Sequence, residues 1–147
     1  MKKKVIISAC LLGEACRYDG KTKKINGVIE SFSEYEIIPF CPEAPLFGTP
    51  RQRISVVEID GENKIFTDET HKDVTKLLEH EIQGFISKNH SPDAIVLKSK
   101  SPSCGIGNVP ILNANRELVK YGNGIAAQIF LDNFKDLEIY DENYFIP

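Results

Sequence analysis

Four cysteines are the side chains of this 147-residue chain best suited to chemistry: Cys10, Cys16, Cys41 and Cys104. Three of them follow apolar runs of strand length, at residues 4–8, 35–40 and 93–98. Ligands of open α/β sheets bind beyond the carboxyl ends of parallel strands, so thiols placed after three neighbouring strands would meet at one rim. The positions therefore predict a shared thiol site rather than cysteines buried separately as small apolar residues.

The spacing of the cysteines leaves three kinds of site open. Structural zinc sites usually contain close pairs such as C-x₂-C, and a redox dithiol usually has the spacing C-x-x-C. The sequence contains neither pair. Dispersed single cysteines suit a larger group such as an iron–sulfur cluster, so spacing alone favours the cluster only modestly over zinc and thiol chemistry.

Polar side chains lie beside two of these cysteines. The segment "CPEAPLFGTPR", residues 41–51, places Glu43 two residues after Cys41, on a loop that three prolines stiffen. The segment "KSKSPSCGIG", residues 98–107, places Ser101 three residues before Cys104. A carboxylate and a hydroxyl next to a metal centre are suited to proton transfer to a bound substrate.

Strands and helices alternate along the sequence, which predicts a single α/β domain over residues 1–147, with three Rossmann-like layers and a mainly parallel sheet. Besides the three runs above, we expect a hairpin of strands at 54–59 and 64–66 around "DGEN", and a last strand at 137–140. We expect helices at 27–34, 69–88 and 122–134, with residues 99–121 forming a glycine-rich loop.

The longest of these helices has a single apolar stripe, formed by Val74, Leu77, Leu78, Ile82, Phe85 and Ile86. Thr67 or Thr70 is the expected cap of its first turn. The glycines of "YGNG", before the last helix, fit either an anion site at the helix N-terminus or close packing of the helix.

The net charge and the lengths of the apolar runs argue against nucleic acids and membranes as partners of this protein. The formal net charge of −3 gives no support to a nucleic-acid polymer or an anionic membrane surface as the partner. No apolar run reaches the roughly 18–20 residues that span a bilayer, and the apolar part of "MKKKVIISAC" is too short for a signal peptide. We therefore expect a cytoplasmic protein with reduced cysteines, as a monomer or a homodimer.

Four segments together resemble the thiouracil desulfidase family: "SACLLGEACRYDG", "CPEAPLFGTPR", "LKSKSPSCG" and "YGNGIAAQIF". They occur in the family's order over essentially the whole chain, which we expect to be the short, stand-alone form. One difference lies in the second segment, where the family often has a double glycine after the residue that follows "CPE" and this chain has Pro45 and Leu46.

The resemblance implies a 4Fe-4S cluster held by Cys10, Cys41 and Cys104, with one iron open to the sulfur of a substrate and with loss of the cluster in air. It implies catalytic roles for Glu43 and Ser101, and it leaves Cys16 as a rival ligand. The implied reaction is the non-redox desulfuration of a small thiolated nucleobase, such as a thiolated pyrimidine, with release of sulfide. Two other functions stay open: a sulfur-carrier or cluster-binding protein without turnover, and a zinc or thiol-redox module.

Overall fold

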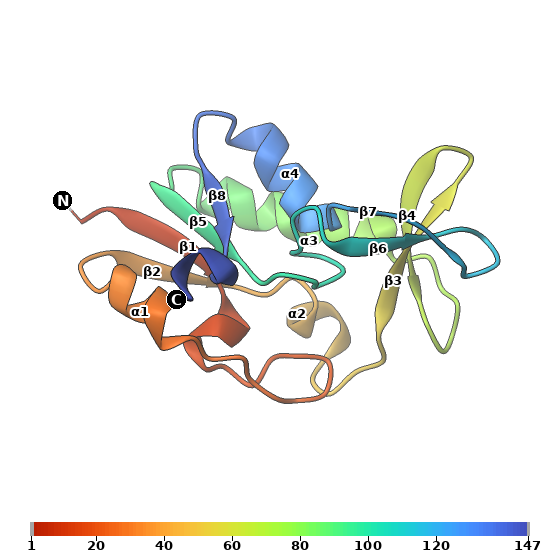
Figure 1. Ribbon diagram of the computed structural model, residues 1–147, viewed down its shortest axis with the longest axis horizontal. Helices are drawn as coiled ribbons and strands as arrows, with labels where there is room; N and C mark the ends of the chain where they lie inside the picture. Colours follow the sequence, from red (N-terminus) through yellow and green to blue (C-terminus); the bar gives the residue numbers. More distant parts are fainter. Residues whose placement is uncertain (1, 147) are drawn as a thin grey trace.

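Four parallel strands form the first sheet of the computed structural model, which describes residues 2–146 (Figure 1). The order across this sheet is β2 (Glu36–Phe40), β1 (Lys4–Ser8), β5 (Ala94–Leu97) and β8 (Ile139–Asp141). The predicted α/β fold with a mainly parallel sheet is thereby confirmed. The three strands that precede Cys10, Cys41 and Cys104 are neighbours and run in the same direction, so their carboxyl ends lie at one edge.

A second sheet has the strand order β4, β3, β6, β7. Its strands are β3 (Ile54–Ile59), β4 (Glu62–Thr67), β6 (Val109–Leu112) and β7 (Leu118–Gly122). The antiparallel hairpin of β3 and β4 turns at Asp60 and Gly61, both at positive φ, as the Asp-Gly pair predicts.

The prediction of a loop over residues 99–121 was wrong, because β6 and β7 lie within it. Pro110 interrupts the short apolar run of β6. Strand β6 pairs in parallel with β3, which lies far from it in the sequence. Four of the five residues of β7 are exposed, so this strand has no alternation of buried and exposed side chains. Neither strand therefore has the local pattern by which strands are recognised.

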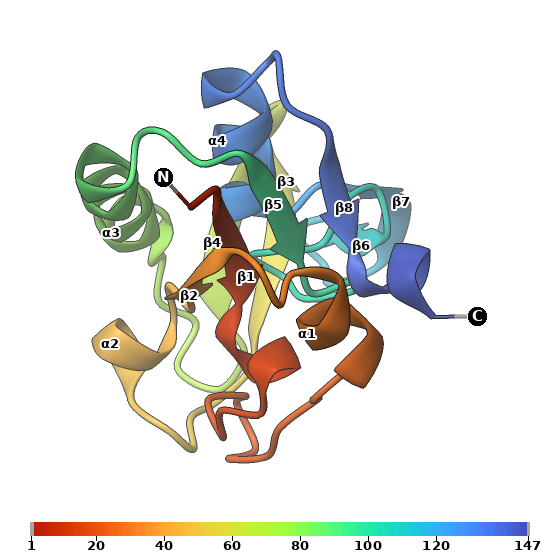
Figure 2. The same ribbon diagram turned by 90° about the vertical axis from the view of Figure 1, so that its left-hand side faces the viewer.

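Helices cover both faces of the first sheet. The side chain of Ile6 packs on one face, in a core with α3 (Thr75–Lys88), α4 (Ile125–Asn133) and the inner face of the second sheet. Its neighbours Val5 and Ile7 pack on the other face against α1 (Asn26–Ser31). Figure 2 shows α1 and α3 on opposite sides of β1, which gives the three layers that the alternation of strands and helices predicts.

Three short elements complete the fold, and all of them lie next to cavity residues. The 3₁₀ turn η1 (Ala9–Leu12) follows β1, the single-turn helix α2 (Ala44–Phe47) follows Glu43, and the 3₁₀ turn η2 (Glu142–Phe145) follows β8.

Helix α3 begins six residues later than predicted, and neither Thr67 nor Thr70 caps it. The chain after β4 first turns back on that strand, with a bridge between Phe66 and Asp73. The carboxylate of Asp73 then accepts hydrogen bonds from the amide and hydroxyl of Thr75, at 2.9 and 2.6 Å. The rest of the apolar stripe is buried or partly buried, but Leu77 is 55% exposed and does not belong to it.

Candidate functional site

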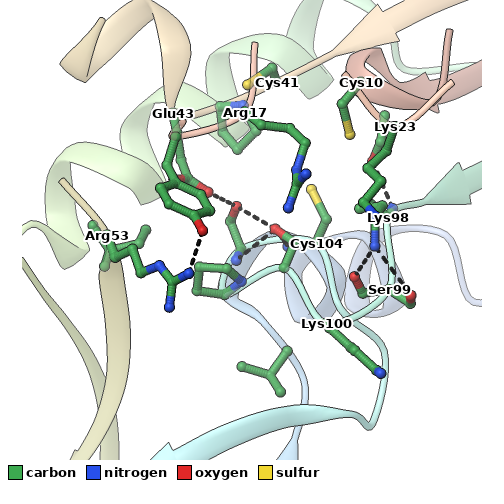
Figure 3. Close-up of a pocket in the computed structure, with 18 of the residues that line it drawn as sticks. Cys10, Arg17, Lys23, Cys41, Glu43, Arg53, Lys98, Ser99, Lys100 and Cys104 are labelled. Carbon is green, nitrogen blue, oxygen red and sulfur yellow. Dashed lines mark hydrogen bonds between the residues drawn. The ribbon is translucent and has the colours of Figure 1, made fainter. Parts of the chain in front are cut away.

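A cavity of about 680 Å³ lies at the edge of the first sheet where β1, β2 and β5 end. All four cysteines line it, together with Glu43 and Ser101. Cys10 and Cys104 are buried, and Cys16 and Cys41 are half-buried. Figure 3 shows Cys10, Cys41 and Cys104 around the same space, so the structure brings together the side chains that the sequence predicted to converge.

The first wall of the cavity follows from the end of β1. The hydroxyl of Ser8 accepts a hydrogen bond from the Lys98 amide at 2.9 Å, which joins the ends of β1 and β5. The next turn, η1, carries Cys10, whose carbonyl accepts from the Lys23 amide at 3.0 Å and from the Thr22 hydroxyl at 3.1 Å. These contacts fold the segment between Cys10 and Lys23 back over the cavity, and the segment places Cys16 there too.

The loop of Cys104 is fixed by the first turn of α4. The carbonyl of Ser103 accepts from the amides of Ala126 and Ala127, at 2.8 and 3.2 Å. A Cβ atom on Gly124 would lie 2.5 Å from the Ser103 backbone, so only glycine permits this approach. Of the two explanations for "YGNG", the structure therefore supports packing, because the loop carbonyl already occupies the helix N–H groups.

Glu43 and Ser101 belong to one hydrogen-bonded group. The Glu43 carboxylate is 7% exposed and accepts from the Ser103 hydroxyl at 2.6 Å and from the Arg51 guanidinium at 3.4 Å. The Ser101 oxygen lies 3.4 Å from the Ser103 oxygen and accepts from the Cys104 amide at 3.1 Å. Ser103 therefore stands between the two residues predicted to be catalytic and fixes the direction of the carboxylate.

A second carboxylate, Glu142 of η2, also lines the cavity. It accepts from the amide and hydroxyl of Ser99, both at 2.7 Å, and it pairs with the Lys98 ammonium at 3.0 Å. Sequence reasoning missed Glu142 because no motif surrounds it and its partners lie more than forty residues earlier. It also missed the ion pair of Arg51 with Glu43, although both residues lie in the segment "CPEAPLFGTPR".

The surroundings keep three of the thiols neutral while no metal is bound. Burial raises the pKa of Cys104 to about 12. A hydrogen bond with Cys10 is the main cause that raises the pKa of Cys16 to about 11. The pKa of Cys41 is raised by a hydrogen bond with Cys16 and by burial. Binding of a metal centre by Cys41 and Cys104 must therefore release their protons.

The donor set fits an iron–sulfur cluster better than a single metal ion. Within residues 2–146, no three Cys, His, Asp or Glu side chains lie close enough to hold one ion, as a tetrahedral zinc site at about 2.3 Å from each sulfur would require. A cluster of four irons is a larger object and takes thiolates from separate loops. Cys10, Cys41 and Cys104 lie on three such loops around one cavity.

Comparisons with known proteins identify the family of this chain. The family described as 2-thiouracil desulfurase matches residues 5–142. A solved structure, the 4Fe-4S-dependent thiouracil desulfidase TudS, is 32% identical, with a TM-score of 0.70, over 97% of this chain and 92% of that one. The uncharacterized protein YbbK of Bacillus subtilis (strain 168) is 31% identical over 112 residues, which is 70% of this chain and 74% of YbbK.

No helix within residues 2–146 is long and apolar enough to cross a bilayer.

Proposed function

The chain belongs to the 2-thiouracil desulfurase family, and from this membership we propose that it hydrolyses the carbon–sulfur bond of a thiocarbonyl compound. The compound exchanges its C=S sulfur for the oxygen of water, and sulfide leaves, so the reaction involves no net oxidation or reduction. The observation that carries this proposal is the cavity in which the four thiols, Glu43 and Ser101 meet.

Cys10, Cys41 and Cys104 are the proposed ligands of a 4Fe-4S cluster, the cofactor named for the related TudS. Each comes from a separate loop beyond β1, β2 or β5. A cluster held by these three cysteines would supply a Lewis acid with one position left open for the sulfur of the substrate. Cys16 lies on the same cavity and is proposed not to be a ligand.

Glu43 is the proposed base for the attacking water. Its second oxygen is held by Ser103 and its first by Arg51, so the carboxylate keeps one direction while water approaches the C=S carbon. Ser101 accepts from the Cys104 amide. Because the Ser103 hydroxyl donates its proton to Glu43, the Ser101 O–H is the donor in the 3.4 Å contact with the Ser103 oxygen, a long bond that it can exchange for one to the departing sulfur. The proposed roles are therefore removal of a proton from water by Glu43 and delivery of a proton to the departing sulfur by Ser101, which regains its proton from Glu43 through the Ser103 hydroxyl.

Cations at the cavity favour a substrate with an anionic group. Lys23 and Lys100 line the cavity, and in the part of the chain that the structure describes neither has a carboxylate within ion-pair distance. Arg17 lines it as well, 3.9 Å from its partner Asp19. A positive mouth on a protein of net charge −3 attracts anions locally. We therefore expect a thiolated pyrimidine that carries a phosphate to be a better substrate than the free base.

Anaerobic reconstitution followed by an assay of sulfide release tests the proposal. The protein is loaded with iron and sulfide and offered thiolated uracil, its nucleoside monophosphate, and the corresponding oxygen compounds as controls. We expect sulfide and the carbonyl product in equal amounts, with a lower KM for the phosphorylated substrate. A stably bound cluster without turnover of any thiolated pyrimidine would reject the enzyme in favour of a sulfur carrier, and a colourless protein that contains zinc would reject the cluster.

A further inference from the structure

The turn η2 contains a carboxylate, Glu142, that lines the cavity and binds the segment after β5. Glu142 is 5% exposed, and its two oxygens accept from the amide and hydroxyl of Ser99 and from the Lys98 ammonium. The turn itself is capped by the preceding residue, Asp141, which accepts from the Asn143 amide at 2.9 Å. The buried carboxylate of Glu142 is thus not needed to close η2.

The segment that Glu142 holds leads directly to Ser101. Strand β5 ends at Leu97, and the chain then turns sharply at Lys100, whose φ of 62° is unusual for a residue with a side chain. Such a conformation persists only where its surroundings hold it. The Lys100 amide donates to the Asn108 side chain at 2.9 Å on one side of the turn, and Ser99 is bound by Glu142 on the other.

We propose that Glu142 is a positioning residue, which acts through Ser99 to hold the turn at Lys100 and so directs the Ser101 hydroxyl into the cavity. The inference rests on the proposed function, because it assumes that Ser101 takes part in turnover. Burial alone would raise the pKa of Glu142, but the hydrogen bonds from Ser99 and Lys98 outweigh it and lower the pKa, so the carboxylate is charged at neutral pH. This charge balances the half-buried Lys98 ammonium.

Steady-state kinetics of three variants test the role in catalysis. Glu142→Ala loses every contact with Ser99, and we expect it to keep its iron content and its KM while kcat falls about 10- to 100-fold, as small misplacements of a reacting group do. Glu142→Gln can still accept from the Ser99 amide, so we expect it to recover most of kcat. The matched control is Asp141→Ala, which loosens η2 without touching Ser99 and should keep the wild-type kcat.

Hydrogen exchange of the cluster-free protein gives a readout that does not depend on activity. We expect the amides of residues 99–101 to exchange faster in Glu142→Ala than in the wild type or in Asp141→Ala. If both variants behave alike in kinetics and exchange, Glu142 serves only to anchor the C-terminal turn, and the proposal is wrong.

Two outcomes need a second comparison. Glu142→Ala leaves the Lys98 ammonium without its counter-ion, so this variant can fail to fold. In that case the double variant Glu142→Ala, Lys98→Met is compared with Lys98→Met alone. The expected differences in kcat and in hydrogen exchange are the same. If the unaltered protein with its cluster releases no sulfide, the proposed function fails, while the exchange experiment still decides whether Glu142 holds the turn.

Discussion

Burial at the cavity raises the pKa of the Cys104 thiol and of the Glu142 carboxylate alike, but the net shifts of the two groups have opposite directions. Cys104 has its pKa raised to about 12 and stays neutral, whereas Glu142 has its pKa lowered because its hydrogen bonds outweigh desolvation. The difference lies in the partners: Glu142 accepts hydrogen bonds from Ser99 and faces the Lys98 ammonium, whereas the hydrogen bonds of Cys104 with Ser8 and Ser103 lower its pKa by less than burial raises it. Cys104 is thus kept neutral until a metal centre binds, while Glu142 is held charged by its neighbours.

Single cysteine substitutions should separate the ligands from the remaining thiol. We expect Cys10→Ser, Cys41→Ser and Cys104→Ser each to lose stable cluster binding, because each removes one of three thiolates. Cys16→Ser, the matched control on the same cavity, should retain the cluster. Iron and acid-labile sulfide per chain are counted after anaerobic reconstitution, and equal loss in all four variants would mean that four cysteines bind the cluster and that no iron is open.

Substitution of Glu43 and Ser101 should separate catalysis from cofactor binding. Neither side chain needs to bind iron where thiolates are present, so Glu43→Gln and Ser101→Ala should keep the visible absorption of the cluster. Proton transfer is usually worth about 10²–10⁴ in rate, and we expect sulfide release to fall by a factor in this range. Wild-type turnover in both variants would show that these residues are not the base and the acid.

The lowered pKa of Glu142 predicts a loss of stability in acid. The unfolded chain, in which glutamate has its ordinary pKa of about 4.3, binds more protons than the folded protein below that pH. The stabilisation is therefore complete above about pH 4.3 and is lost as the pH falls through the lowered pKa of the folded state. Denaturant unfolding of the cluster-free protein at several pH values should show a shallower acid loss in Glu142→Gln, and an unchanged pH dependence would contradict the assignment.

Among the elements, those with a local pattern could be predicted and those fixed by distant contacts could not. Strands β1, β2 and β5 each read as a continuous apolar run because they are covered on both faces, and the cysteines follow them directly in sequence. The start of α3 was misplaced because a bridge from Phe66 to Asp73 delays it. Strand β6 pairs with β3, more than fifty residues earlier, and Glu142 binds Ser99 from more than forty residues away, so a single sequence shows no sign of either contact. Strand β7 pairs with the nearby β6, but it has no alternation of buried and exposed residues by which it could be recognised.

Two glycines in helical surroundings predict opposite effects of the same substitution. Gly124→Ala would bring a methyl group 2.5 Å from the Ser103 backbone, so α4 must shift from the Cys104 loop, at a cost of about 1–3 kcal/mol and with poorer retention of the cluster. Gly84 lies inside α3 with open space around it, and Gly84→Ala should stabilise the protein by about 0.5–1 kcal/mol. Denaturant unfolding and iron content measure both, and equal effects would refute the close-approach argument for Gly124.

At the scale of the whole molecule, one hydrophobic core is shared by both sheets, α3 and α4. The cavity lies beside the loops that follow β1, β2 and β5. Residues 1–147 are predicted to be one domain, so we expect a single cooperative unfolding transition in the cluster-free protein. A group that binds only the folded state raises its stability, so the loaded protein should unfold at a higher temperature under anaerobic conditions. Cys104→Ser should show no such difference, and two separate transitions would contradict a single domain.

The strand order β2-β1-β5-β8 also determines when, during biosynthesis, the protein can receive its cofactor. β5, which forms one flank of β1, begins at residue 94, ninety residues after β1 begins at residue 4, so Cys10 leaves the ribosome well before β5 and Cys104 are made. The carboxylate that fixes the Ser99 backbone comes from residue 142. A nascent chain therefore exposes early thiols that have no cavity around them, and maturation with iron and sulfide is expected to wait until Glu142 has been made and can bind Ser99.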